Sequence, residues 1–131
     1  MKFSTRANYG LRLCFLIGVA DETISLSSLT KQTGLSQKYL EQLLGMLKKG
    51  GIVSSTRGAN GGYVLARPLD AISVKDVLVA VNDHFEIDCA TGECHDDYCP
   101  NRRIFLRLYD QMDEMLSSFT LKDMIDDYKC H

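Results

Sequence analysis

Apolar residues recur at the three- and four-residue spacing of an amphipathic helix in three stretches of the chain. The stripe within 4–20 is formed by Tyr9, Leu13, Leu16, Ile17 and Ala20. The second, between Ser36 as N-cap and the Gly50-Gly51 pair, is formed by Leu40, Leu43, Leu44 and Leu47. The third, within 101–119, is formed by Phe105, Leu108, Met112, Met115 and Phe119. The pattern predicts three helices, each with one face to bury.

Shorter elements surround the leucine-rich second helix. A helix over 28–33, capped by Ser27 and ended by Gly34, precedes it. Two strands joined by a glycine-rich turn follow it. The predicted strands are 52–56 and 63–66, and the turn between them is 57–62. A short helix, a turn, a longer helix and a hairpin, in this order, are typical of a winged helix-turn-helix.

Two capping boxes predict the remaining helices. Ser73 and Asp76 begin a helix over 72–81, and Thr120 with Asp123 begins one over 121–128. The predicted fold class is mostly α with a small β wing, a winged helix-turn-helix followed by a long C-terminal dimerisation helix. We expect a DNA-binding domain over 1–81 and a cysteine-containing sensor loop over 82–100. A dimerisation helix with a cap helix is expected over 101–131.

The stripe of the long helix covers only about two heptads, so it does not predict a free-standing coiled coil. It is expected to pair with its own copy in a symmetric homodimer. Packing of this stripe within one chain is the alternative.

The polar face of the leucine-rich helix has the chemistry of a DNA-reading surface. Gln37 and Glu41 flank a central row opposite the leucines, which is formed by Lys38, Gln42, Gly45 and Lys49. A partly basic face of this kind can enter a DNA major groove. Arg57, at the start of the glycine-rich turn, suits the negative potential of a narrow minor groove. The alternative is an ordinary helix and hairpin without a ligand.

Charge is divided unevenly along the chain. Residues 1–70 hold nine Lys and Arg against four Asp and Glu, a net charge of +5. Residues 71–131 hold six against thirteen, a net charge of -7. The N-terminal half is therefore the candidate polyanion-binding part, with double-stranded DNA as the expected partner.

Three of the five cysteines lie at equal intervals in an acidic stretch without helical or strand period: Cys89, Cys94 and Cys99. Thiolates suit iron–sulfur clusters or zinc, and three of them leave one coordination position for another ligand. The local candidates for that position are His84, Glu86, Asp88 and His95. An acidic loop with free thiols is the alternative. Cys14 is expected to be a buried small hydrophobe and Cys130 part of a frayed tail.

Other classes of protein are disfavoured. No apolar run is long enough to span a bilayer, and Arg12 interrupts the N-terminal apolar stretch that a signal peptide needs. A cytoplasmic protein without a membrane partner is expected. There is no Ser/His/Asp order, phosphate loop or zinc-protease motif, so neither an enzyme nor a small-molecule substrate is expected.

Three runs carry a family resemblance: STRANYGLR, GLSQKYLEQLL and RGANGGYVLARP. They resemble the bacterial winged-helix regulators that include the iron–sulfur regulator IscR, the nitric-oxide sensor NsrR and the cysteine regulator CymR. The resemblance implies a dimeric DNA-binding repressor or activator. It implies that a set of helix residues faces bases and phosphates, namely Ser36, Gln37, Lys38 and Glu41, and that Arg57 and Gly58 of the wing enter the minor groove.

The resemblance also implies that Cys89, Cys94 and Cys99 ligate a two-iron or four-iron cluster. The intervals between these cysteines contain four residues, where the family's cluster binders typically have five. Arg102 stands where IscR-like members place a histidine, and Asn8 where NsrR-like members lend an aspartate from the partner subunit. The predicted function is a transcriptional regulator that senses iron–sulfur cluster, redox or nitric-oxide status. The alternative is a thiol-disulfide or zinc-responsive regulator on the same scaffold.

Overall fold

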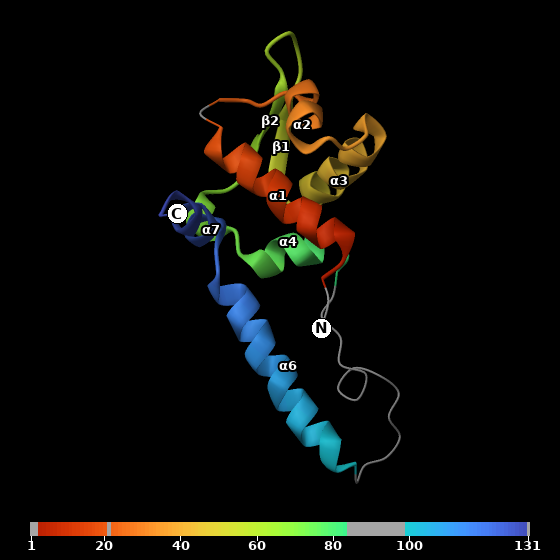
Figure 1. Cartoon of the computed structure of the whole chain (residues 1–131), viewed down its shortest axis with the longest axis vertical. Coiled ribbons are helices and arrows are strands. Elements are labelled where there is room, and N and C mark those ends of the chain that lie inside the picture. Colours follow the sequence, from red (N-terminus) through yellow and green to blue (C-terminus); the bar gives the residue numbers. More distant parts are fainter. Residues whose placement is uncertain (1–2, 21, 84–98, 131) are drawn as a thin grey trace.

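The chain folds into a head with a projecting arm (Figure 1). The computed structural model describes residues 3–20, 22–83 and 99–130. In chain order the elements are α1 (Thr5–Val19), α2 (Leu26–Thr33), α3 (Gln37–Lys49), β1 (Val53–Thr56), β2 (Gly62–Leu65), η1 (Leu69–Ala71), α4 (Val74–Ala80), α6 (Pro100–Ser118) and α7 (Leu121–Lys129). The predicted fold class, mostly helical with a small wing, is confirmed. None of the helices in the described ranges is long and apolar enough to cross a membrane.

The core of the head lies between α1 and α3. The helix α1 buries Leu13, Cys14 and Ile17 on one side, and α3 buries all four of its stripe leucines. Tyr9 of α1 packs edge-on against Tyr39 of α3, with ring centroids 6.2 Å apart. Residues from the other elements close the same core, including Ile24, Leu29, Ile52, Val53, Ile72, Val77, Val81 and Leu121. The fold buries the whole predicted stripe of α3. Of the predicted α1 stripe it buries Leu13 and Ile17, whereas Tyr9, Leu16 and Ala20 are half-buried.

The start of α2 differs from the prediction by two residues. Ser25, not Ser27, is the N-cap, because its hydroxyl accepts a hydrogen bond from the Ser28 amide at 3.1 Å. The backbone of Ile24 is held in an extended bridge to β2, so Ser25 is the first residue that can turn into a helix. The predicted end at Gly34 is confirmed, since this residue has φ +72° in the left-handed region that favours glycine.

The wing is an antiparallel hairpin in which Val53 lies opposite Leu65 and Thr56 opposite Gly62. The first strand begins one residue later than the predicted 52–56. The second strand begins and ends one residue earlier than the predicted 63–66. Gly62 is required by packing, because a Cβ there would collide with the carbonyl group of Ile24. The Ile24 bridge thus adds a short third segment to the sheet and ties the wing to the start of α2.

Both predicted capping boxes are present. The Ser73 hydroxyl accepts from the Asp76 amide and the Asp76 carboxylate accepts from the Ser73 amide, each at 3.0 Å. Thr120 and Asp123 make the same pair of bonds at 3.2 and 2.9 Å. The segments that carry these two caps also pair with each other in an antiparallel bridge. The beginnings of α4 and α7 are therefore joined, and this joint holds the C-terminal end of α6 on the head.

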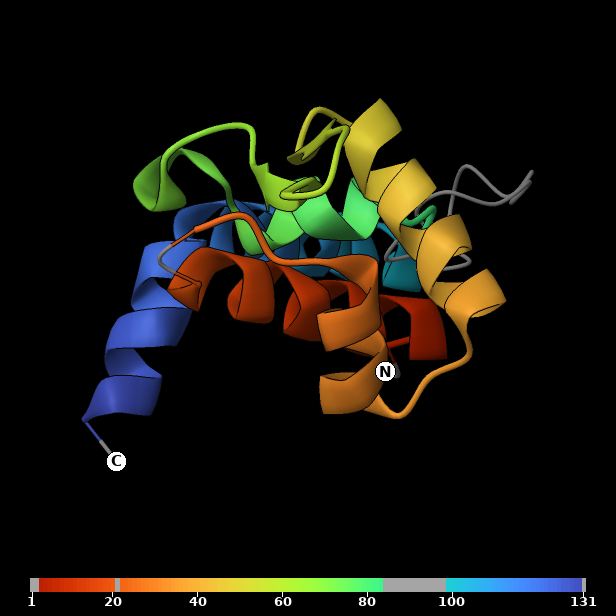
Figure 2. The ribbon, with the colours of Figure 1, turned by 90° about the horizontal axis from the view of Figure 1, so that it is seen from above.

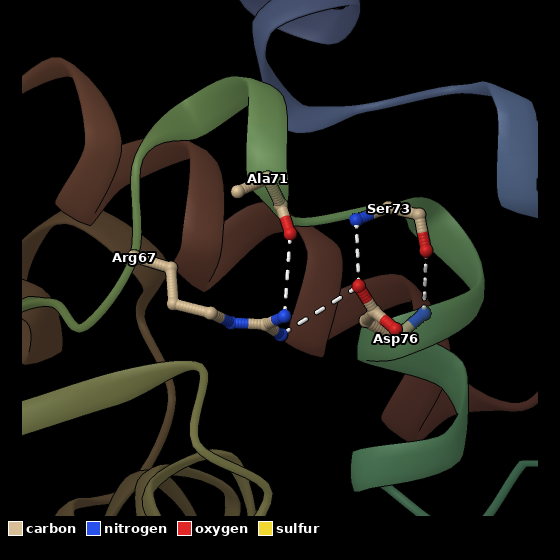
Figure 3. A network of polar contacts seen from close by, with 4 residues as sticks. All are labelled: Arg67, Ala71, Ser73 and Asp76. Carbon is tan, nitrogen blue, oxygen red and sulfur yellow. Dashed lines mark hydrogen bonds and ion pairs between the residues drawn. The ribbon is translucent and has the colours of Figure 1, made fainter.

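A polar cluster connects the base of the wing to the same joint (Figure 3). Arg67, just after β2, donates to the Ala71 carbonyl at 3.2 Å and forms an ion pair with Asp76 at 3.6 Å. The same oxygen of Asp76 accepts the Ser73 amide in the capping box. One carboxylate therefore contacts both the segment that leaves the wing and the start of α4.

The helix α6 is the arm. It begins at Pro100 after Cys99 and ends at Ser118, one residue earlier at each end than the predicted 101–119. Proline suits the first helical position because its missing amide hydrogen is not needed there. Lys75 of α4 donates to Asp113 of α6 at 2.7 Å, and this bond raises the pKa of Lys75. No residue of α6 is buried by the described part of the chain.

Candidate nucleic-acid interface

The orientation of α3 follows from its cap and its leucines. The Ser36 hydroxyl accepts a hydrogen bond from the Tyr39 amide at 3.2 Å, which fixes the first turn as predicted. Because all four stripe leucines are buried, the opposite side of the helix faces solvent. The residues exposed on α3 are Gln37, Lys38, Glu41, Gln42, Gly45, Lys48 and Lys49.

The exposed side of α3 carries hydrogen-bonding groups and net positive charge. Gln37 donates to the Glu41 carboxylate at 3.3 Å, so these two predicted base-facing residues stabilise each other in the free protein. Within the described part of the chain, Lys38 and Lys49 are in neither of the two salt bridges that the structure contains. Their charges are thus available to an external polyanion.

The wing is attached directly to the C-terminal half of α3. Lys48 donates to the Ser55 hydroxyl on β1 at 2.8 Å, which links the helix to the wing strand. Arg57 and Gly58 follow β1 and are exposed. Gly58 has φ +110°, a conformation that side chains rarely allow, so the turn needs glycine there. In Figure 1 the wing, α2 and α3 lie at the end of the molecule opposite the arm.

The structure places the cysteines in different surroundings. Cys99 is half-buried at the position that precedes α6, whereas Cys89 and Cys94 lie outside the described residues. Cys14 is buried in the core, as expected. Cys130 is exposed, but it is the C-cap of α7 and not part of a frayed tail, because its amide donates to the Asp126 carbonyl at 3.1 Å. Within residues 3–20, 22–83 and 99–130 there is no group of three or more His, Cys, Asp or Glu residues that could hold a metal ion.

Cys14 should be chemically inert in the folded protein. Burial raises the pKa of its thiol from 9.0 to about 12, so almost no thiolate is present at neutral pH. In native protein, mass spectrometry after brief iodoacetamide treatment should find Cys130 alkylated and Cys14 unmodified. Because the pKa of the Cys14 thiol is higher in the folded than in the unfolded protein, the thiol contributes to the free energy of unfolding. This contribution is complete below pH 9 and is lost as the pH rises toward 12. Rapid alkylation of Cys14 in native protein would contradict its place in the core.

Three contacts near these surfaces were missed by sequence reasoning. Lys48–Ser55 and Arg67–Asp76 join residues on different elements, which no periodicity reveals. Ser4, the N-cap of α1, also donates through its amide and hydroxyl to Asp83 at 2.9 and 2.8 Å. Ser4 itself is recognisable from sequence as a cap, but its second partner is 79 residues away along the chain.

Comparison with known proteins agrees with this arrangement. The model of the Rrf2 family, described as an iron-dependent transcriptional regulator, matches residues 3–127. The protein rrf2 of Nitratidesulfovibrio vulgaris is 34% identical, over 97% of this chain and 89% of its own length. The HTH-type transcriptional regulator CymR of Bacillus subtilis is 36% identical, over 95% of this chain and 89% of its own.

Solved structures show the same fold. CymR of B. subtilis, called the global cysteine regulator, matches with a TM-score of 0.81 at 34% identity, over 96% of this chain and 97% of that one. T. potens IscR matches with a TM-score of 0.78 at 35% identity, over 98% and 88%. The relatives are regulators rather than enzymes, as the sequence led us to expect. Since sequence and fold agree from α1 to α7, the chain belongs to the Rrf2 family of transcriptional regulators.

Proposed function

We propose that this regulator binds duplex DNA as a homodimer and reads it with α3 and the wing. The observation that carries the proposal is the exposed polar side of α3, which the fold leaves uncovered while burying the leucines behind it. In this proposal Ser36, Gln37, Lys38 and Glu41 contact base edges and nearby phosphates in the major groove. Arg57 and Gly58 enter the adjacent minor groove.

Selection of duplexes from a random-sequence library tests DNA binding directly. The protein should enrich a roughly palindromic site, because a two-fold symmetric dimer presents two equivalent recognition helices. Affinity for that site should fall steeply with salt concentration, as lysine and arginine displace counterions from phosphates. Failure to enrich any sequence, together with salt-independent retention of DNA, would contradict the proposal.

The homodimer is proposed to form through α6. Three residues of its apolar stripe are exposed in the single chain, with Leu108 42%, Met115 56% and Phe119 51% accessible, and the other two, Phe105 and Met112, are half-buried. A helix with a long uncovered apolar stripe needs a partner, and a second copy offers the same stripe. The alternative is that the stripe packs within one chain. The described part of the same chain leaves Leu108, Met115 and Phe119 uncovered.

The charges on α6 favour an antiparallel pair. They are opposite to those that stabilise an isolated helix, which prefers acidic residues at its N-terminal end and basic residues at its C-terminal end. Two copies running in opposite directions place the basic half of one beside the acidic half of the other. The basic residues are Arg102, Arg103 and Arg107, and the acidic ones are Asp110 and Glu114, whereas Asp113 is already paired with Lys75 of the same chain.

The sensing role is proposed for Cys89, Cys94 and Cys99. The described one of the three, Cys99, directly precedes α6, so a centre bound by these thiolates would act on the start of the dimer helix. The family model is described as iron-dependent, and T. potens IscR and the cysteine regulator CymR share this fold. We therefore propose a two-iron or four-iron cluster, with zinc binding or a thiol-disulfide switch as the alternative.

Protein purified without oxygen should contain iron and acid-labile sulfide and absorb visible light. Cys94→Ala should lose both iron and colour while its far-UV circular dichroism stays unchanged. Cys14→Ala is the matched control, and it should retain iron because its thiol lies in the core. One zinc per chain without iron would support the alternative, and iron-free, colourless protein after anaerobic reconstitution would contradict the cluster.

A further inference from the structure

Gly45 lies on the exposed side of α3, and nothing in the described part of the fold requires glycine at this position. Of the nine glycines in the described residues, Gly34, Gly51 and Gly58 have positive φ. A Cβ at any of five others would come within 3.1 Å of a neighbouring atom, and these are Gly10, Gly18, Gly50, Gly61 and Gly62. At Gly45 a Cβ would meet nothing within 4 Å, and its φ is not positive.

The lack of a side chain at this position weakens the helix. Glycine is among the least favourable residues inside a helix, because the unfolded chain gains entropy and no side chain packs on the neighbouring turns. Gly45 is in the ninth position of the 13-residue α3, well away from both caps. The chain therefore gives up helix stability at a point where alanine would fit without steric conflict.

The surroundings of Gly45 indicate what the missing side chain makes room for. Lys38 precedes it by seven residues and Lys49 follows it by four, so all three lie along one face of the helix. Both lysines are exposed and lie outside the two salt bridges of the described chain. A bare stretch of backbone between two such cations suits a polyanion that comes close to the helix axis.

From these observations, and resting on the proposed DNA-binding function, we infer that Gly45 is the point of closest approach between α3 and the duplex. An α-helix with its side chains is about 10–12 Å across, close to the major-groove width of about 12 Å. Removing one side chain lets the backbone sit deeper. The contact then extends from the first turn of α3 to its third, about 12 Å further along the axis.

This inference requires stability and DNA affinity to change in opposite directions. Gly45→Ala should raise the melting temperature of the free protein by about 2–5 °C, because alanine is the best helix former. The same change should weaken binding to the library-selected duplex by about 5- to 100-fold, the range expected for overpacking a close contact. Gly45→Gln, which keeps good helix propensity but is longer, should weaken it further.

Ser117→Ala is the matched control, since Ser117 is an exposed helical residue on α6, far from α3. It should leave affinity for the selected duplex unchanged, whatever its effect on melting temperature. The slope of affinity against salt should stay the same for Gly45→Ala, because no charge is removed. If wild-type protein selects a duplex and both Gly45 variants bind it equally well, the inference fails while the proposed function stands. If wild-type protein selects no duplex, both fail.

Discussion

Replacing Leu108 and Met115 with glutamate should convert the protein to a monomer and reduce its affinity for the selected duplex at least 100-fold. Both side chains lie on the exposed stripe of α6. Burying one large apolar side chain contributes about 1.5–3 kcal/mol, and a two-fold interface counts each residue twice. Glutamate would remove this contribution and place four like charges in the same seam. A monomer can occupy only one half-site, so it loses most of the affinity of the dimer.

Analytical ultracentrifugation across a range of concentrations measures the first effect, and titration of the labelled duplex measures the second. The head of the variant should stay folded, because α6 contributes no buried residue to its core. Ser117→Glu provides a control for the introduced charge, since this residue is exposed on α6 outside the stripe. A variant that remains dimeric, or a wild-type protein that sediments as a monomer, would show that α6 is not the interface.

Arg57→Ala should weaken binding to the selected duplex by about 1–3 kcal/mol, or about 5- to 150-fold. Arg57 is exposed directly after β1, and the tight turn at Gly58 leaves no bulky side chain beside it. A narrow A·T-rich minor groove has an enhanced negative potential that favours arginine inserted into it. The hairpin does not use the Arg57 side chain in its ladder, so the melting temperature should be unchanged.

The groove that Arg57 enters can be identified with modified DNA. Inosine·cytosine pairs lack the guanine amino group, so they keep the minor-groove pattern of A·T pairs while changing the major groove. Wild-type protein should tolerate inosine·cytosine, but not guanine·cytosine, in the segment that the wing protects. Lys122→Ala, which removes an exposed charge on α7, is the control and should bind normally. Unchanged affinity of Arg57→Ala would show that the wing is not a specific contact.

Local patterns in the sequence were enough to define most of the elements. The leucine spacing of α3, the glycine at the end of α2 and both capping boxes each specify a structure within a few residues. One predicted cap was misplaced, at Ser27 in place of Ser25, and this error shows the limit of local patterns. Either serine is a suitable cap by itself, and the choice depended on the pairing of Ile24 with the distant strand β2.

The chemistry of the candidate interface was also readable from the sequence, but its geometry was not. The polar row of α3 and the arginine of the wing follow from residue types and spacing. The Lys48–Ser55 bond and the bridge that holds α6 on the head depend on which surfaces meet. Sequence likewise could not separate Gly45 from the glycines that the fold requires, since that distinction depends on the atoms around an absent side chain.

The sequence by itself determined the order of the α-helices and strands, most of the faces that must be buried and the family of the chain, because these depend on residue spacing and local hydrogen bonding. Only the tertiary structure decided whether another segment of the chain covers a given surface: within the described residues it leaves part of the α6 stripe and the space beside Gly45 uncovered. Exposure depends on packing between segments far apart in the chain, and no local pattern encodes it.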